Sequence, residues 1–323
     1  MLAEGPGAHQ EPVVRRPAGA GAVRGLQRLA LQFDILPPDA ALDGYRAVVV
    51  PETTRITAGL AARLGDFTAA GGALLVSGDA ALGEDGSPVL PALGLAGAGA
   101  PLDHAFLRRA GDAAAFAEVM YEPSLPLVPA PGAETLYDLV AGYFPRTWDR
   151  FSGHDCTPVG TAGPAGAAVV VHGVTATTGA PLFTAIGRHA AEAHHRLLAE
   201  VFARILPERE VRAQGPAHLE AVVVDTPESR VVHLLTPSPS RQGEGVSPIT
   251  SRTEGIDLVN DPFPLVGVPL RIRFPAPPAA VALQPHGTEL PFTYRDGQVH
   301  LTVDLAEGHG MVVLREEVAP ALR

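Results

Sequence analysis

The chain has 323 residues, 46% of them hydrophobic, and a formal net charge of −11. The hydrophobic content excludes a chain that is disordered throughout, and the acidic balance argues against binding to nucleic acid, whose phosphates require clustered basic residues. The single cysteine, Cys156, excludes an intrachain disulfide and fits a reducing cytoplasm. No run reaches the roughly 18 apolar residues of a membrane span, and the N-terminus has no apolar secretory core, so we expect no membrane partner.

The N-terminal segment contains little regular pattern before residue 23. Residues 1–22 are polar, aperiodic and rich in Pro, Gly and Ala, and we expect them to form a disordered lead. The spacing of apolar residues over 23–31 predicts a helix. Residues 33–36, which are followed by two prolines, predict a short strand.

A β-α-β unit follows. Tyr45–Val50 is apolar on both faces and stops at Pro51, which is typical of a buried parallel strand. Thr57 is expected to cap a helix that extends to Ala70, and Ala73–Ser77 is a second buried run. The short connections predict a parallel pair of strands with a right-handed crossover.

The middle of the chain indicates further elements of both kinds. We expect short strands at 119–121, 125–128 and 167–171, and helices at 134–141 and 190–206. A proline follows the second helix directly and cannot continue it. The α/β pattern therefore ends near residue 207.

After residue 207 the pattern changes to short β-type runs separated by turns. These runs lie at 219–224, 230–235, 268–274, 280–283, 298–303 and 310–314. Asp296-Gly297 between two apolar runs is a strong hairpin signal. We therefore predict an α/β domain over 23–207 and a small antiparallel β-sandwich over 208–323.

Ser77-Gly78-Asp79 follows a predicted strand, at the position where α/β folds often bind ligands. A catalytic nucleophile there would need a strained Gly-x-Ser-x-Gly or Gly-x-Cys-x-Gly elbow, and Val76–Ala80 contains neither. We therefore favour hydrogen-bonding roles in a turn for Ser77 and Asp79.

Cys156 follows His154 and Asp155, which invites the hypothesis of a nucleophilic triad. We favour a non-catalytic cysteine, because a triad needs a histidine that reaches the sulfur and an orienting group behind it. His189, His194 and His195 lie on or beside the helix predicted at 190–206, but they do not share one helix face. No His-Glu-x-x-His motif occurs. We therefore expect no metal ion and no cofactor.

One stretch has an unusual signature. Residues 143–154 read Tyr-Phe-Pro-Arg-Thr-Trp-Asp-Arg-Phe-Ser-Gly-His and are followed by Thr157-Pro158. This stretch resembles a "YFNRTWEHFCSHxxTP" segment in the C-terminal region of bacterial glycosidases related to family-42 β-galactosidases. Other segments resemble that region in the same order, namely residues 32–36, 48–52, 71–78, 181–183, 233–235, 255–261, 268–274 and 308–314. The resemblance covers roughly residues 24–316.

The resemblance implies a flavodoxin-like or class I glutamine-amidotransferase-like α/β domain with a parallel sheet, followed by a small β-domain. In that family the catalytic carboxylates lie in an N-terminal (β/α)8 barrel, which would precede residue 24. No catalytic residue is therefore carried over to this chain. The sequence also departs from the family at Ser152, which stands where the family has a cysteine.

In trimeric members of the family, the α/β domain lies between subunits and can border the active site of the neighbour. The resemblance therefore makes Arg146, Trp148, Phe151 and His154 candidates for an interface or an active-site rim. Packing of Trp148 and Phe151 inside the protein is the alternative, and we favour it.

We expect a non-catalytic accessory or oligomerisation portion of a bacterial glycoside hydrolase that is inactive alone. Its expected partners are further copies of itself, a trimer among them, or a glycosidase chain that contains the barrel, and carbohydrate is a further candidate ligand. Two alternatives stay open. One is a stand-alone carbohydrate-binding module, which an aromatic content of 5% does not favour, and the other is a hydrolase that uses the amidotransferase-like fold itself.

Overall fold

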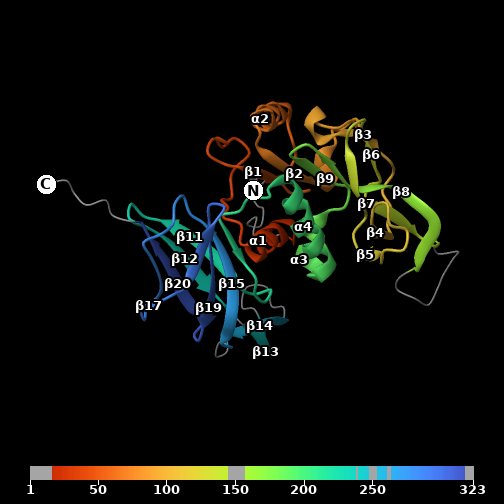
Figure 1. The fold of residues 1–323 in the computed structure, drawn as a ribbon. Coiled ribbons are helices and arrows are strands. Elements are labelled where there is room, and N and C mark those ends of the chain that lie inside the picture. Colours follow the sequence, from red (N-terminus) through yellow and green to blue (C-terminus); the bar gives the residue numbers. More distant parts are fainter. Residues whose placement is uncertain (1–16, 145–156, 238, 247–252, 260–262, 317–323) are drawn as a thin grey trace. The chain divides into compact units, whose positions relative to one another are not determined.

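The computed structural model describes residues 17–144, 157–237, 239–246, 253–259 and 263–316 (Figure 1). The chain forms two compact units. The first contains the chain up to Gly25 together with Phe33–Pro207, and the second combines Leu26–Gln32 with Glu208–Arg323. The polypeptide therefore passes from one unit to the other at 25/26, 32/33 and 207/208.

The first unit is built on a mixed nine-stranded sheet. Its strands are β1 (Ala47–Val50), β2 (Ala73–Ser77), β3 (Leu95–Ala98), β4 (Ala105–Arg109), β5 (Glu118–Met120), β6 (Leu127–Pro129), β7 (Glu134–Gly142), β8 (Val159–His172) and β9 (Thr175–Thr178). The main order is β1-β2-β9-β8-β7-β4-β5, and β6 joins β3 to β8. Strands β1, β2 and β9 are parallel to one another, whereas the other described pairs are antiparallel. The expected parallel sheet thus extends over three strands.

The predicted β-α-β unit is confirmed. β1 and β2 are joined by α2 (Ala58–Ala69), and the hydroxyl of Thr57 accepts a hydrogen bond from the backbone of Leu60 at 3.3 Å. The helix ends before Gly71, whose positive φ of 91° places it in the left-handed region that glycine adopts without strain. β1 and β2 then pair in register, with Val48 opposite Leu74.

Helix α1 (Pro17–Arg28) begins earlier than the sequence indicated, so residues 17–22 are helical although we expected them in the lead. Packing explains this helix, because Ala18, Ala22 and Leu26 are all buried. A Cβ atom on Gly21 would lie 1.9 Å from the carbonyl oxygen of Phe183. The Gly/Ala-rich sequence therefore allows a close helix contact inside the first unit.

Two further expectations were wrong. Residues 134–141, expected to be helical, form most of β7, because this segment pairs with β4 on one side and with β8 on the other. Residues 33–36 do not form a strand. The helix expected at 190–206 is present as α4 (Glu192–Ile205), and α3 (Leu182–His189), which the sequence did not indicate, precedes it.

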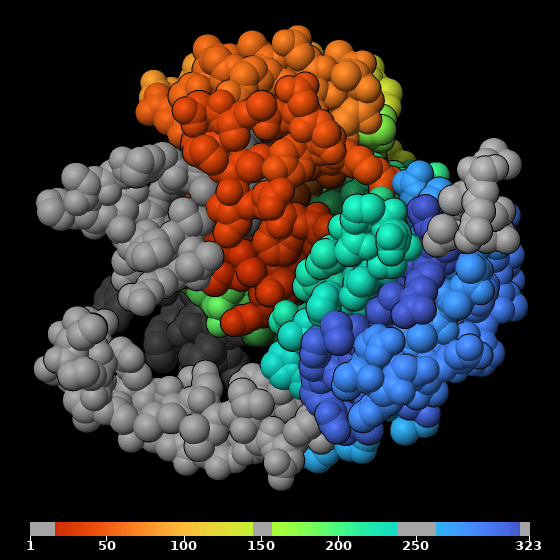
Figure 2. All heavy atoms as spheres, turned by 90° about the vertical axis from the view of Figure 1, so that its left-hand side faces the viewer, coloured from red at the N-terminus to blue at the C-terminus, as the bar shows by residue number. Residues whose placement is uncertain are grey.

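The second unit contains two antiparallel sheets that share one core. One sheet has the order β10-β15-β19-β18, and the other has the order β11-β12-β20-β16-β17. The bounds are β10 (Val211–Ala213), β11 (Glu220–Asp225), β12 (Ser229–Leu235), β15 (Leu265–Arg273), β16 (Ala280–Gln284), β17 (Thr288–Glu289), β18 (Phe292–Arg295), β19 (Gln298–Leu305) and β20 (His309–Arg315). A separate hairpin consists of β13 (Pro239–Val246) and β14 (Thr253–Val259). In Figure 2, the early strands of this unit (teal) lie directly beside its late strands (blue).

The antiparallel β-domain is therefore confirmed, as is its clearest turn. Asp296 and Gly297 join β18 to β19 and have φ values of 52° and 72°, the left-handed pair that a two-residue hairpin turn requires. None of the helices in the described ranges is long and apolar enough to cross a membrane.

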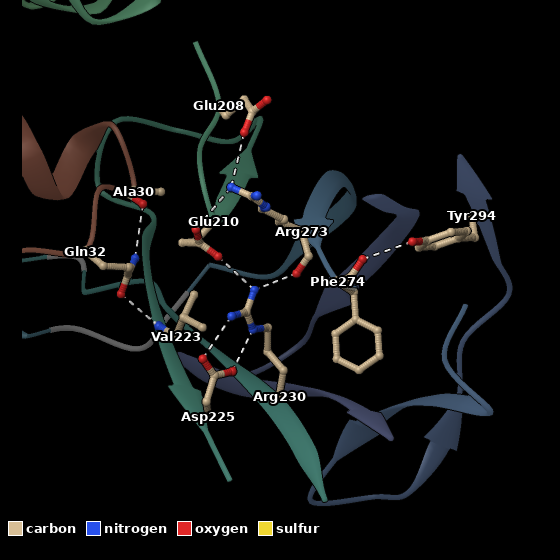
Figure 3. A network of polar contacts seen from close by, with 10 residues as sticks. All are labelled: Ala30, Gln32, Glu208, Glu210, Val223, Asp225, Arg230, Arg273, Phe274 and Tyr294. Atoms are coloured by element: carbon tan, nitrogen blue, oxygen red, sulfur yellow. Dashed lines mark hydrogen bonds and ion pairs between the residues drawn. The ribbon is translucent and has the colours of Figure 1, made fainter. Parts of the chain in front are cut away.

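A polar network connects strands from both sheets of the second unit (Figure 3). At its centre, the Arg230 guanidinium binds the Asp225 carboxylate through two bonds of 2.6 and 2.8 Å. It also donates to Glu210 at 2.9 Å and to the backbone oxygen of Arg273 at 2.6 Å. These contacts join β11, β12 and β15, which belong to different sheets.

Candidate functional site

Ser77, the last residue of β2, is fully buried. Its hydroxyl donates to the carbonyl oxygen of Ala180 at 3.3 Å and accepts from the backbone N–H of Leu182 at 3.1 Å. The hydroxyl of Thr178 lies 3.2 Å away. The structure thus places Ser77 in a hydrogen-bonding role. Its partners are not in the expected local turn but 101 to 105 residues further along the chain, where they fix the start of α3.

Glu52 supports the same helix from the end of the neighbouring strand. It follows β1, and its carboxylate accepts a hydrogen bond from the backbone N–H of Thr184. A carboxylate is favourable at this place, because a helix N-terminus carries partial positive charge. Gly78 has a φ of 64°, and a Cβ atom there would lie 2.7 Å from Cβ of Glu52. Glycine at 78 therefore leaves room for the carboxylate to reach α3.

An open groove of about 910 Å³ lies beside Glu52, at the carboxyl ends of β1 and β2. Its lining mixes polar and apolar residues and is formed by residues 52–58, 79–80 and 82–86 together with Leu125. Arg55 and Glu84 form an ion pair at its rim. The groove is thus located where ligands bind in α/β sheets.

The chemistry of this groove does not fit a catalytic centre. Its described lining contains no serine, cysteine or histidine. A side-chain hydrogen bond from Ser87 lowers the pKa of the Asp85 carboxyl, whereas a general acid at neutral pH needs a raised pKa. Glu84 is bound to Arg55 and Glu52 to α3. The groove can therefore accept a ligand or a surface with polar groups, but its described lining contains no arranged acid–base pair.

A second polar cluster surrounds Glu122, which is 7% exposed. Its carboxylate accepts hydrogen bonds from Arg188 at 2.8 Å and from His189 at 2.9 Å, both from the last turn of α3. Burial raises the pKa of Glu122, but the hydrogen bonds from His189 and Arg188 outweigh burial, and the net pKa is below its ordinary value. The cluster fixes an ionised carboxylate rather than a catalytic acid.

His194 lies on α4 near this cluster and is completely buried. Its Nε2 donates to the backbone oxygen of Val119 at 3.1 Å. Burial is the main cause that lowers the pKa of His194, so the neutral ring is favoured. Within the described ranges, no group of three or more His, Cys, Asp or Glu side chains is arranged to hold a metal ion.

The strongest candidate for a contact surface is the pair of strands β7 and β8. β8 has 14 residues, and only its second half is buried, because none of the residues 159–166 is buried. Neighbouring residues on a strand point to opposite faces, so this half of β8 is open on both sides. This half of β8 and the end of β7 beside it form an arm at the margin of the sheet (yellow to green in Figure 1), and β7 also pairs with β4 as far as Ala141. Tyr143 and Val159 at the described end of this arm are 64% and 39% exposed.

The candidate residues from the sequence all belong to the connection between β7 and β8. Arg146, Trp148, Phe151 and His154 lie outside the described residues, as does Cys156. Their assignment to an interface or a rim therefore stays a prediction. Sequence reasoning missed the roles of Glu52 and Glu122. The only signal for Glu52 was its position, since it follows a predicted buried strand and Pro51.

Residues 23–84 match a family model described as "Beta-galactosidase trimerisation domain". The predicted resemblance is confirmed. The match to this trimerisation domain includes α2, β1, β2 and most of the groove lining. A curated relative, β-galactosidase Bga of Halorubrum lacusprofundi, is 49% identical over 55 residues, which are 17% of this chain and 7% of that protein.

Solved structures extend the likeness to both units. An α-L-fucosidase isoenzyme 2 from Paenibacillus thiaminolyticus has a TM-score of 0.84 at 23% identity, over 98% of this chain and 48% of that one. A cold-adapted β-galactosidase from Rahnella sp. R3 has a TM-score of 0.53 at 16% identity, over 92% and 36%. The family-42 β-galactosidase Gan42B of G. stearothermophilus has a TM-score of 0.54 at 13% identity, over 97% and 38%. These likenesses are of fold, and the chain spans half or less of each solved protein.

Proposed function

We propose that this chain is the accessory, oligomerisation part of a glycoside hydrolase of the β-galactosidase type and that it has no catalytic centre of its own. The match of residues 23–84 to a trimerisation domain carries this proposal. The groove chemistry supports it, because the carboxylates there are engaged in structural contacts. The burial of Ser77 speaks against a hydrolase that uses the amidotransferase-like fold itself.

The arm of β7 and β8 is the contact surface that we propose for assembly with further copies of the chain. Residues 159–166 of β8 include no buried residue within one subunit, so a neighbouring subunit would supply the missing burial. In the sequence, the connection between β7 and β8 contains Trp148 and Phe151, and large aromatic side chains are enriched in protein interfaces. We also propose that α2 and the parallel strands β1, β2 and β9 correspond to the amidotransferase-like part of the expected fold, and that the protein acts in the cytoplasm.

Sedimentation velocity of the purified chain tests this proposal. We expect an assembly larger than the monomer, a trimer being the first candidate. The double variant Tyr143→Ser/Val159→Glu places polar groups on the arm and should shift the chain towards the monomer. Val174→Glu is the matched control, because Val174 is similarly exposed at the turn between β8 and β9, and it should leave the assembly unchanged. Circular dichroism should be the same for all proteins.

A monomeric wild-type chain at its highest soluble concentration would contradict the assembly, and an unchanged double variant would contradict the arm as its site. The absence of a catalytic centre has a separate test. We expect no release of aryl alcohol from aryl galactosides or aryl fucosides by the purified chain. Hydrolysis that survives a second purification step would refute this part of the proposal.

A further inference from the structure

The outer face of the four-stranded sheet in the second unit carries a row of basic side chains. Alternate residues of its strands, such as Val211, Leu270 and Leu301, point into the core, so the residues between them point outward. The register places Arg212 of β10 opposite Arg271 of β15, and Arg271 opposite His300 of β19. Three basic residues from three strands therefore form one line across the sheet.

A fourth basic residue adjoins this line from the next strand. Nε of Arg295, at the end of β18, lies 3.4 Å from Nε2 of His300. Arg212, Gln214, Arg271 and His300 line a pocket of about 170 Å³, and Pro269 and the buried residues Leu270 and Leu301 complete its walls. The backbone N–H of Gln214 donates to the oxygen of Pro269 at 3.0 Å, which fixes this side of the pocket to β15.

Like charges that face one another across strands destabilise a sheet, and the nearby arginines avoid this problem. Arg273, two residues further along β15, pairs with Glu208 at 3.2 Å, and Arg230 pairs with Glu210 and Asp225. For Arg271 and Arg295, no described carboxylate lies within ion-pair distance. Such a concentration of positive charge is unusual in a chain whose formal net charge is −11.

The pKa of His300 reflects the same local positive charge. Partial burial, Arg295 and Arg271 lower its pKa, and the nearby Asp296 carboxylate opposes them. The arginines thus outweigh the Asp296 carboxylate in their effect on the pKa of His300. A bound anion would relieve the repulsion between Arg271 and Arg295, for which no described carboxylate lies within ion-pair distance.

We propose that the pocket of Arg212, Gln214, Arg271 and His300 binds the oxyanion group of a small acidic ligand. Sulfate, phosphate and carboxylate groups share the required chemistry, because a guanidinium presents paired N–H donors that match two oxygens of such a group. Gln214 adds an amide that can bind a neighbouring hydroxyl. A volume of about 170 Å³ is smaller than a drug-sized site, so the pocket fits one anionic group and part of its carrier. Nucleic acid is disfavoured by the acidic net charge.

Isothermal titration with five probes tests this site: inorganic sulfate, inorganic phosphate, galacturonate, galactose 6-sulfate and neutral galactose. We expect at least one anion to bind and galactose not to bind. Affinity should fall as the salt concentration rises, because the site is open to solvent. Arg271→Gln should weaken binding by about tenfold or more, since it removes a charged donor pair. The order of affinities for the anions identifies the group that the site prefers.

Arg315→Gln is the matched control. Arg315 is also exposed, lies at the end of β20 in the other sheet and changes the net charge by the same amount. It should leave anion binding unchanged. Binding by none of the anions, or equal weakening by both variants, would refute the proposal.

This inference goes beyond the proposed oligomerisation and does not depend on it. Arg271→Gln should therefore sediment like the wild-type chain, and Tyr143→Ser/Val159→Glu should still bind the anion. The failure of one proposal can thus be distinguished from the failure of the other.

Discussion

The side-chain amide of Gln32 takes the place of a neighbouring strand beside Val223 of β11. Its Oε1 accepts from the backbone N–H of Val223 at 2.9 Å, and its Nε2 donates to the backbone oxygen of Ala221 at 3.0 Å (Figure 3). Val223 follows Gln32 by 191 residues. An open strand edge promotes pairing with other chains, so this one side chain both satisfies the backbone and closes the edge.

Gln32→Ala should destabilise the second unit and open this edge. The loss of one partly buried and one exposed hydrogen bond to the backbone corresponds to ~1–2 kcal/mol in the free energy of unfolding. Amide hydrogen exchange at Val223 should become faster, and NMR measures it directly. Gln27→Ala is the control, since its contact with Glu220 is long, at 3.5 Å. Unchanged exchange at Val223 would show that the amide contributes nothing to the edge.

Arg230→Lys should weaken the network of Figure 3 although it keeps the charge. A lysine ammonium cannot form the paired bonds that the guanidinium forms with Asp225 and, at the same time, reach Glu210 and the backbone of Arg273. We expect a loss of ~1–3 kcal/mol, measured by urea unfolding. The matched variant Arg273→Lys should cost less, because the Arg273 side chain is more exposed and its contacts are longer. Equal losses would contradict a central role for Arg230.

Ser77→Ala should reduce the stability of the first unit, because Ser77 has a structural role and not a catalytic one. The variant removes a buried hydroxyl that donates to the carbonyl oxygen of Ala180 and accepts from the N–H of Leu182. This N–H keeps a second acceptor, the Ala180 oxygen at 2.8 Å, and the expected cost is ~1–2 kcal/mol in the free energy of unfolding. Ser87→Ala is the control, because Ser87 also bonds through its hydroxyl, to Asp85 at 2.7 Å, but in an exposed turn. If both variants unfold at the wild-type denaturant concentration, the capping role of Ser77 is wrong.

The Glu122 carboxylate should make the first unit sensitive to acid. Its pKa is lowered in the folded protein, so its stabilisation is fully present above the ordinary glutamate pKa of about 4.3 and disappears as pH falls through the lower, folded pKa. Glu122→Gln should remove this part of the pH dependence. Glu118→Gln, which breaks the more exposed pair with Arg196, should change it less. Identical slopes in wild type and Glu122→Gln would contradict the assignment.

His194 should act in a higher pH window. Because burial lowers its pKa in the folded protein, the unfolded chain binds a proton first. Stability therefore decreases as pH falls below the ordinary histidine pKa of about 6.5. His194→Gln retains a donor for Val119 and should make stability nearly constant between pH 7 and 5.5. A variant with the same slope as wild type would exclude His194 as the source.

Local signals predicted the β-α-β unit and the hairpin of the second unit. Thr57 caps its own helix, and Asp296-Gly297 forms its own turn, so the cause and the effect lie within a few residues. β7 shows the opposite case. Its sequence looked helical, but pairing on both sides made it a strand.

Helix α3 could not be predicted, because it lacks a local cap. Pro181 at its N-cap position makes no side-chain hydrogen bond, and the caps come from Ser77 and Glu52, which precede their helix partners by 105 and 132 residues. The basic pocket could not be predicted for the same reason, because its residues are distant in the sequence. Arg212, Arg271 and His300 are scattered along the sequence, and only the register of three strands brings them into one line.

The second unit has a consequence for how this protein can be divided. A chain that began at Glu208 would lack Ala30, which is part of the core, and Gln32, which covers β11. A simple cut at the apparent boundary therefore removes structure from the piece that it is meant to release. The two units are not exchangeable modules, and we expect evolution to have transferred them together. A free-standing version would need residues 26–32 rejoined to residue 208 through a new connection.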